Sequence, residues 1–179
     1  MKKLLKNASE KLSLLVLCSL ALIAASCSSD DPVEPPVNVD PIQLDCDYFI
    51  ENRTLVDNPN APIDYIVSCV SQVRANLIVE PGVVIAFTPD SGLILRENVS
   101  SIQAVGTANK PIVFTGTQPT RGSWRGIFVE SENSSNIMEF VTVSYGGGQA
   151  FNSNGDRGNV IVYADGALTL KNCTVINSQ

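Results

Sequence analysis

Histidine is absent from this chain of 179 residues, and no two cysteines stand in a CxxC motif. Without histidine, Ser–His and Cys–His nucleophile schemes are excluded for this segment. The lack of both histidine and CxxC spacing also argues against a zinc site. The sequence therefore predicts no catalytic residue of these types, no metal site and no cofactor.

Basic residues are also scarce, and many of them stand near the N-terminus. The chain has 12 Lys and Arg against 18 Asp and Glu, a net charge of −6. Removing residues 1–26 would leave 8 basic residues (12 − 4) against 17 acidic ones (18 − 1), or −9. Nucleic acids and anionic lipid surfaces are both recognised by clustered Lys and Arg. We therefore expect neither nucleic acid binding nor electrostatic docking on a membrane.

No apolar run is long enough to span a bilayer, which takes about 20 residues. Residues 12–25 form a shorter apolar run behind four lysines, as in the h-region of a signal peptide. The run ends in small residues followed by Cys27, which resembles a bacterial lipobox. In such signals the cysteine becomes the lipidated first residue, so we predict a signal peptide at 1–26, lipidation of Cys27 and attachment to the outer membrane. The alternative is an ordinary secretory signal with an unmodified cysteine.

Residues 27–45 are rich in Pro and Asp, and no basic residue occurs between Cys27 and Arg53. Such a segment buries too little apolar surface to fold, so it is predicted to be a disordered, extended tether. An acidic stretch directly after a lipidated cysteine also resembles the surface-export signal of Bacteroidetes lipoproteins. A plain solubilising linker is the alternative.

Two of the remaining cysteines, Cys46 and Cys69, are close enough in sequence for a disulfide in an exported protein. Closing that loop would stabilise the fold by about 3 kcal/mol in the chain-entropy model. Two unpaired thiols are the alternative. Residues 46–76 are predicted to be an N-terminal cap, whereas Cys173 is expected to be a small core residue.

Short β-rich runs replace helix signals from Tyr65 onward, separated by Gly, Asn, Asp, Ser and Pro. They are LIV (77–79), VVIAF (83–87), LIL (93–95), IQAV (102–105), IVF (112–114), GIFV (126–129), IMEFVTV (137–143), VIVY (160–163), LTL (168–170) and CTVIN (173–177). Apolar positions recur with a period of about 30 residues, for example from Ile127 to Val160. Three runs thus form a unit, and the units 93–116, 127–145 and 160–177 stack. This pattern predicts an all-β, right-handed parallel β-helix of about three coils over 77–179, rather than an antiparallel sandwich.

The runs YIVSCVSQVRANLIVEPGVVIAF, IQAVGTANKPIVFTGT, WRGIFVES and LTLKNCTVINS, from about residue 63 onward, resemble the β-helix lipoproteins of Bacteroidetes. The resemblance implies a fold and a cell-surface location but no reaction, because that group is mostly without assigned biochemistry. The chain stops at CTVINSQ in the middle of a coil, so we expect a β-helix truncated at its C-terminus. A last coil covered by a partner chain is the alternative.

Alternation along the strands assigns residues to faces. Leu93, Leu95, Ile127, Val129, Val160 and Val162 should point inward in the first strand, and Ile112, Phe114, Val141, Val143, Cys173 and Val175 in the third. Ile94, Phe128 and Ile161 then form an outward apolar column beside Tyr163. This column is a candidate binding strip, unless loops or the segment 46–69 cover it. Trp124, the only Trp, is either a sugar-binding residue or a corner residue that packs inside.

Chemistry on the outer face has few candidates. Glu130 and Glu132 are neighbouring carboxylates, and Asp156–Arg157 places an acid beside a base in a Gly- and Asn-rich loop. We expect a non-catalytic binding or scaffold module at the cell surface, contacting glycans or a surface protein. The alternative is the N-terminal part of a polysaccharide lyase or hydrolase whose active site lies on further C-terminal coils.

Overall fold

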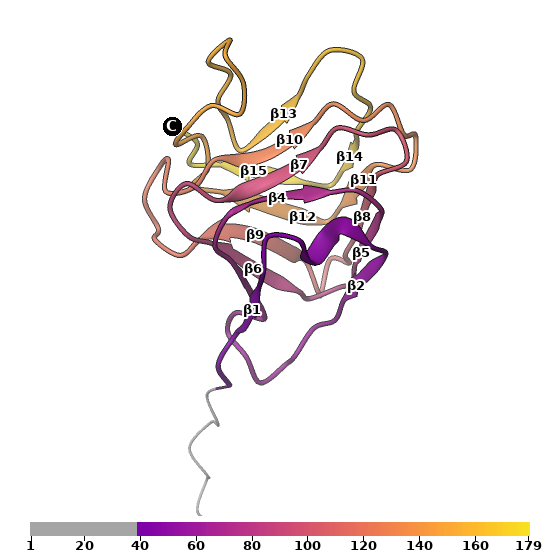
Figure 1. Ribbon diagram of the computed structural model, residues 1–179. Coiled ribbons are helices and arrows are strands. Elements are labelled where there is room, and N and C mark those ends of the chain that lie inside the picture. Colours follow the sequence, from indigo (N-terminus) through magenta and orange to yellow (C-terminus); the bar gives the residue numbers. More distant parts are fainter. Residues whose placement is uncertain (1–38) are drawn as a thin grey trace, which may run out of the picture. The chain divides into compact units, whose positions relative to one another are not determined.

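Residues 39–179 are described by the structure, a computed structural model, and they form a stack of short parallel strands (Figure 1). The predictions for the signal peptide, for Cys27 and for most of the tether lie outside these residues. In the described part of the chain, no helix has the length and apolar character needed to cross a bilayer.

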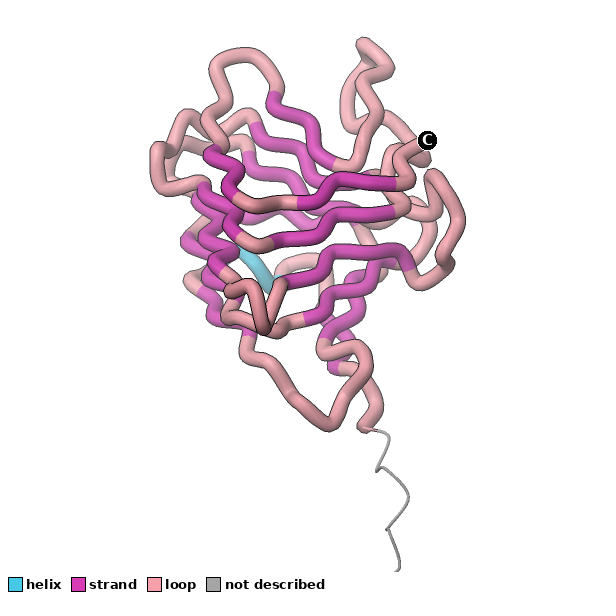
Figure 2. Tube along the Cα trace, turned by 180° about the vertical axis from the view of Figure 1, so that it is seen from behind, coloured by secondary structure: helices cyan, strands magenta, loops and turns pink. Residues whose placement is uncertain are grey.

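Three parallel sheets run along the stack, and their strands lie in tiers (Figure 2). The six-stranded sheet consists, in spatial order, of β1 (Ile42–Leu44), β3 (Tyr65–Val67), β6 (Val84–Phe87), β9 (Ile112–Gly116), β12 (Val141–Ser144) and β15 (Thr174–Ile176). The four-stranded sheet consists of β4 (Val70–Val73), β7 (Gly92–Leu95), β10 (Gly126–Val129) and β13 (Val160–Val162). The five-stranded sheet consists of β2 (Arg53–Leu55), β5 (Asn76–Val79), β8 (Ser101–Val105), β11 (Ile137–Glu139) and β14 (Thr169–Lys171).

Each coil visits the four-, five- and six-stranded sheets in that order. The groups β4–β6, β7–β9, β10–β12 and β13–β15 make four such coils, which confirms the predicted parallel β-helix for the described residues. The sequence predicted about three coils over 77–179, and the described residues form four, the first of which begins before residue 77 at β4. Val73 pairs with Leu95, and Leu95 pairs with Val129, so the first coil is much shorter than the second. The predicted repeat units therefore begin only at residue 93, although two strands of the first coil, β5 and β6, were predicted as the runs 77–79 and 83–87.

The strands also begin earlier in the chain than residue 77. β1 lies inside the range assigned to the tether, and β2, β3, β4 and the first residue of β5 lie inside the range assigned to the cap. The range 46–76 also contains the short 3-10 helix η1 (Tyr48–Ile50). The Phe49 side chain of this helix is buried in the core. Cys46 and Cys69 form a disulfide with a Cα–Cα distance of 5.8 Å, which ties the segment before η1 to the segment before β4.

The register of the strands follows the predicted repeats. Ile127 is the Cα partner of Leu93 on one side and of Val160 on the other. Met138 pairs with Leu170, as the repeat indicates. In-register stacking places chemically similar side chains above one another, so the interior fills with aliphatic ladders.

One run that the sequence predicts as a single strand forms two strands in the structure. The run 137–143 divides into β11 and β12 because Phe140 adopts a left-handed conformation with φ of 50° and turns the chain. Asn172 does the same one coil later, between β14 and β15, with φ of 52°. The hydrophobic pattern does not show the first of these corners, because the corner residue Phe140 is itself apolar and is followed by the apolar Val141.

The core confirms most of the predicted inward positions. Leu93, Leu95, Ile127, Val129, Ile112 and Phe114 are all fully buried, and Val141 and Val143 are 1% exposed. In the fourth coil, Val160 and Cys173 are only partly buried against the core, and Val162 is 49% and Val175 47% exposed, although all four were expected to be buried. Their inward faces lack a further coil among the described residues, and burial in a β-helix requires a neighbour on both sides.

Buried asparagines join the coils to one another. Asn136 accepts the Ile102 N–H at 3.0 Å and donates through Nδ2 to Ala167 O at 3.0 Å. Asn159, 2% exposed, accepts the Gly146 N–H and donates to Ile176 O at 2.7 Å. These amides satisfy backbone groups at the corners, where the sheet ladders end.

Candidate functional site

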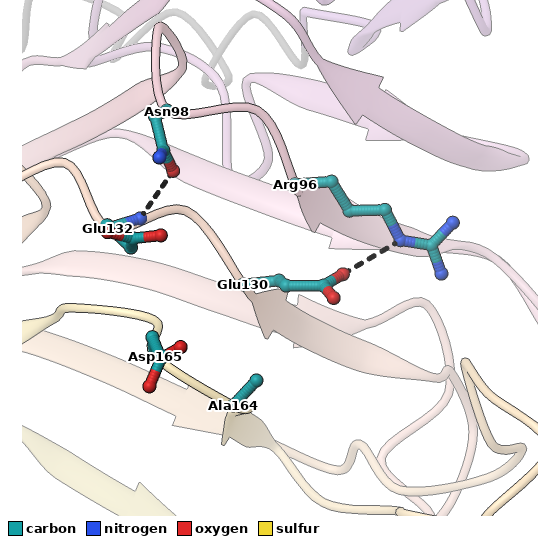
Figure 3. A pocket seen from close by; sticks show the side chains of 6 residues that line it. All are labelled: Arg96, Asn98, Glu130, Glu132, Ala164 and Asp165. Atoms are coloured by element: carbon teal, nitrogen blue, oxygen red, sulfur yellow. Dashed lines mark hydrogen bonds and ion pairs between the residues drawn. The ribbon is translucent and has the colours of Figure 1, made fainter.

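A pocket of about 350 Å³ lies where the chain leaves the four-stranded sheet (Figure 3). Its lining comes from three consecutive coils: Arg96 and Asn98 follow β7, Glu130 and Glu132 follow β10, and Ala164 and Asp165 follow β13. Because β7, β10 and β13 are paired in register, the residues after them are stacked about 4.8 Å apart.

Two interactions organise this pocket. The Arg96 Nε lies 3.3 Å from the Glu130 carboxylate, and the Arg96 guanidinium lies 5.8 Å from the centre of the Phe128 ring. Asn98 accepts the backbone N–H of Glu132 at 2.9 Å, which fixes the turn after β10 against the turn after β7 (Figure 3). The Arg96–Glu130 pair is exposed, so it contributes at most about 1 kcal/mol to stability and acts mainly on side-chain orientation.

The lining is acidic. Three carboxylates and one guanidinium surround the pocket, and the guanidinium is already paired with Glu130. Glu132 and Asp165 make no ion pair with any residue in the described range 39–179. Their oxygens are therefore available as hydrogen-bond acceptors for a ligand that carries hydroxyl or other donor groups.

Aromatic rings adjoin the polar pocket. Tyr163 directly precedes Ala164, and its ring centre lies 5.4 Å from that of Phe128. Phe128 is also covered by Phe151, at a centroid distance of 5.5 Å. Phe151 belongs to the segment 145–159, which joins β12 to β13 and folds back over the outer face of β10.

The predicted binding strip is therefore only partly available. Phe128 is 1% exposed, so it is not a free surface, and the cover is a loop, as one of the two alternatives anticipated. Ile94 and Ile161 are half-buried, as is Tyr163. The segment 46–69 is not what covers Phe128.

Trp124 is not a surface residue. It is fully buried, stacks on Phe87 at a centroid distance of 4.1 Å and donates its Nε1–H to Ser144 O at 2.8 Å. The corner-packing interpretation is correct for this residue, because neither face of its ring is open to a sugar. Its stacking partner belongs to β6, in the first coil, so the two rings meet only through the stacking of coils.

The other acid–base candidates are not brought together in the pocket. Asp156 accepts from the Asn152 amide at 2.8 Å, and Arg157 donates to Gly148 O at 3.4 Å, so both stabilise their own loop. Within the described residues, no group of three or more His, Cys, Asp or Glu is placed to hold a metal ion.

The sequence indicated Glu130 and Glu132 as neighbouring carboxylates, but neither Asn98 nor Asp165 was predicted to lie beside them. The sequence signal for this pocket was the position relative to the strand end: Arg96 and Glu130 each directly follow the last residue of a strand, and the two strands are paired. Applying the same offset to the next two positions would have placed Asn98 beside Glu132.

Comparison with known proteins gives one match. A family model described as a pectate-lyase like beta helix domain matches residues 60–158, more than half of the chain. No curated protein matches the chain, and no solved structure does.

Proposed function

The chain belongs to the family of pectate-lyase-like β-helix domains, and from this premise we propose that it is a lipid-anchored cell-surface module that binds a glycan without cleaving it. The binding site is the pocket at the ends of β7, β10 and β13. The anchor is Cys27, which lies outside the described residues and rests on the lipobox-like sequence before it.

One observation carries the proposal: three coils converge on a single open pocket whose lining consists mostly of hydrogen-bonding side chains. Sugar hydroxyls are both donors and acceptors, and Glu132 and Asp165 supply acceptors without competing ion pairs in the described part of the chain. The lining residues recur from coil to coil, which also suits a ligand made of repeated units. A flat, purely apolar patch would instead fit a protein partner.

The charge of the pocket limits the classes of glycan that it can bind. Three carboxylates repel a polyanionic chain, and the single Arg96 is paired with Glu130. Repulsion between these carboxylates and an anionic ligand makes the binding free energy less favourable, and an exposed salt bridge with Arg96 is too weak to compensate for it. A neutral glycan is therefore the ligand class that the pocket favours.

The test is a glycan array with the full chain, followed by titration of each hit with a paired variant, Glu132→Ala with Asp165→Ala. We expect the variant to bind at least about fivefold more weakly, since two lost hydrogen bonds of about 0.5–1.5 kcal/mol each amount to at least that factor. Glu80→Ala is the matched control, because Glu80 is exposed and lies outside the pocket. Equal affinity of both variants, or no bound glycan at all, contradicts the proposal.

The family description favours a second candidate, a polysaccharide lyase or hydrolase whose active site lies on further coils. Incubating the wild-type protein with each bound polysaccharide and measuring new reducing ends or unsaturated products separates the two. Turnover of a bound glycan would replace the binding-only function with the enzymatic one.

A further inference from the structure

Tyr163 stands at the edge of the pocket. It follows β13 and directly precedes the pocket residues Ala164 and Asp165. Its backbone N–H donates to Val129 O at 2.9 Å, and its carbonyl accepts the Gly166 N–H at 3.0 Å. The backbone of Tyr163 is thus fixed on both sides, in the position next to Glu130 one coil earlier.

Two contacts fix the ring as well. It lies at 30° to the Phe128 ring, and its phenol oxygen accepts a hydrogen bond of 2.8 Å from the Asn154 amide. Because Asn154 donates to this oxygen, the phenol hydrogen stays available as a donor to a ligand. The Tyr163 side chain is half-buried, so part of it faces solvent.

The segment 145–159 supplies Asn154 and is itself held in place. Arg125 donates to Ala150 O at 2.6 Å and to the Gln149 side chain at 3.1 Å. Phe151 packs against Phe128 and closes the segment onto β10. The segment 145–159 is thus held in place, so that the Asn154 amide can orient the phenol of Tyr163.

We propose that Tyr163 is an aromatic platform at the edge of the pocket, directly before its lining residue Ala164, and that Asn154 is its positioning residue. Together they make the site specific for a ring with an apolar face and hydroxyls at its margin, as in a pyranose. The proposal rests on the glycan-binding function proposed above and names the residue that determines its specificity. The ring face of Tyr163 contacts the C–H face of the sugar, and the carboxylates of Glu132 and Asp165 take its hydroxyls. An extended flexible chain without rings gains nothing from such a platform, because it has no flat face to place on it.

The experiment is a titration of the array-selected glycan with the full-chain protein and four variants: Tyr163→Ala, Tyr163→Phe, Asn154→Ala and the double variant Asn154→Ala with Tyr163→Phe. We expect Tyr163→Ala to lose at least about tenfold in affinity, as truncation of an aromatic contact residue does. Tyr163→Phe and Asn154→Ala each keep the ring and should lose about two- to tenfold, the range of one hydrogen bond.

The double variant distinguishes positioning from general damage. If Asn154 acts through the phenol oxygen, the double variant binds no more weakly than the weaker single variant, because the same interaction is removed only once. Losses that multiply would overturn the positioning role. Tyr145→Phe is the matched control: this half-buried tyrosine packs against the hydrophobic core directly after β12, in the six-stranded sheet's corner, and should bind like wild type.

The outcomes keep the two proposals apart. Suppose that the wild type binds a glycan, that the variant lacking the Glu132 and Asp165 carboxylates no longer binds it, and that Tyr163→Ala still does. The platform role of Tyr163 is then wrong, and the glycan-binding function stands. If the wild type binds no glycan, both fall. Urea midpoints of all variants within error of wild type ensure that a lost affinity reports the site and not unfolding.

Discussion

Replacing Asn159 with alanine should destabilise the β-helix far more than its size suggests. The side chain is 2% exposed and joins two coils: it accepts the Gly146 N–H and donates to Val143 O at 3.3 Å and Ile176 O at 2.7 Å. The methyl group of alanine replaces none of these contacts. Three backbone groups at the corners of the third and fourth coils would lose a partner at once.

The magnitude follows from how well water can reach each group. An unsatisfied buried polar group costs about 1–3 kcal/mol. Gly146 is buried and bears the full cost, whereas Ile176 is 46% exposed and its carbonyl can turn to water. The bond to Val143 O is long and contributes least. We therefore expect the free energy of unfolding to fall by about 2–4 kcal/mol, a large part of the roughly 5–15 kcal/mol of an ordinary domain.

Urea denaturation followed by circular dichroism measures this loss, with an unchanged slope m showing that only stability has changed. Asn109→Ala is the control, because Asn109 is exposed and its side chain makes no hydrogen bond among the described residues. The control should shift by less than about 0.5 kcal/mol. A loss below about 1 kcal/mol for Asn159→Ala would refute the view that this amide joins the coils.

Three further predictions concern the anchor, the cap and the core. Cys27→Ala should release the protein from the membrane fraction, and persistent attachment would show that the lipid anchor is wrong. Changing Cys46 and Cys69 to serine should lower the free energy of unfolding by about 3 kcal/mol in urea, so an unchanged midpoint counts against a stabilising disulfide. Trp124→Phe keeps the stacking on Phe87 but leaves Ser144 O without its donor; we expect a loss of about 1–3 kcal/mol by the same measurement, and less than about 0.5 kcal/mol would contradict it.

The interior was predictable because it depends on a local rule. Alternation within a strand decides which side chains point inward, and a parallel stack repeats that choice in every coil. Leu93 and Ile127 could therefore be paired, and assigned to the core, from their spacing alone. The same rule failed at Phe140, where a single left-handed residue ends one strand although it is itself apolar and the apolar Val141 follows it.

The first coil was left out of the predicted repeat because its loops are short, although its strands β5 and β6 were predicted. The distance in sequence from Val73 to its partner Leu95 is well below that from Leu95 to Val129, and the corner loops that make up the difference carry no hydrophobic pattern. Loop length changes the period without changing the fold, because each coil packs only on its neighbours. Strand register is therefore a safer guide to such a chain than a fixed repeat length.

The sequence by itself determined the fold class, the inward ladders and the order of the coils, since these follow from alternation and spacing. Tertiary structure alone decided what lies on the outside. Alternation placed Phe128 in an outward column and left open whether it is covered; Phe151 from the loop between β12 and β13 covers it. Only the stacking of three coils brings Asn98, Glu132 and Asp165 around one pocket. A strand's own sequence specifies which side of the sheet a residue faces, but the neighbours that cover it or leave it open come from distant loops.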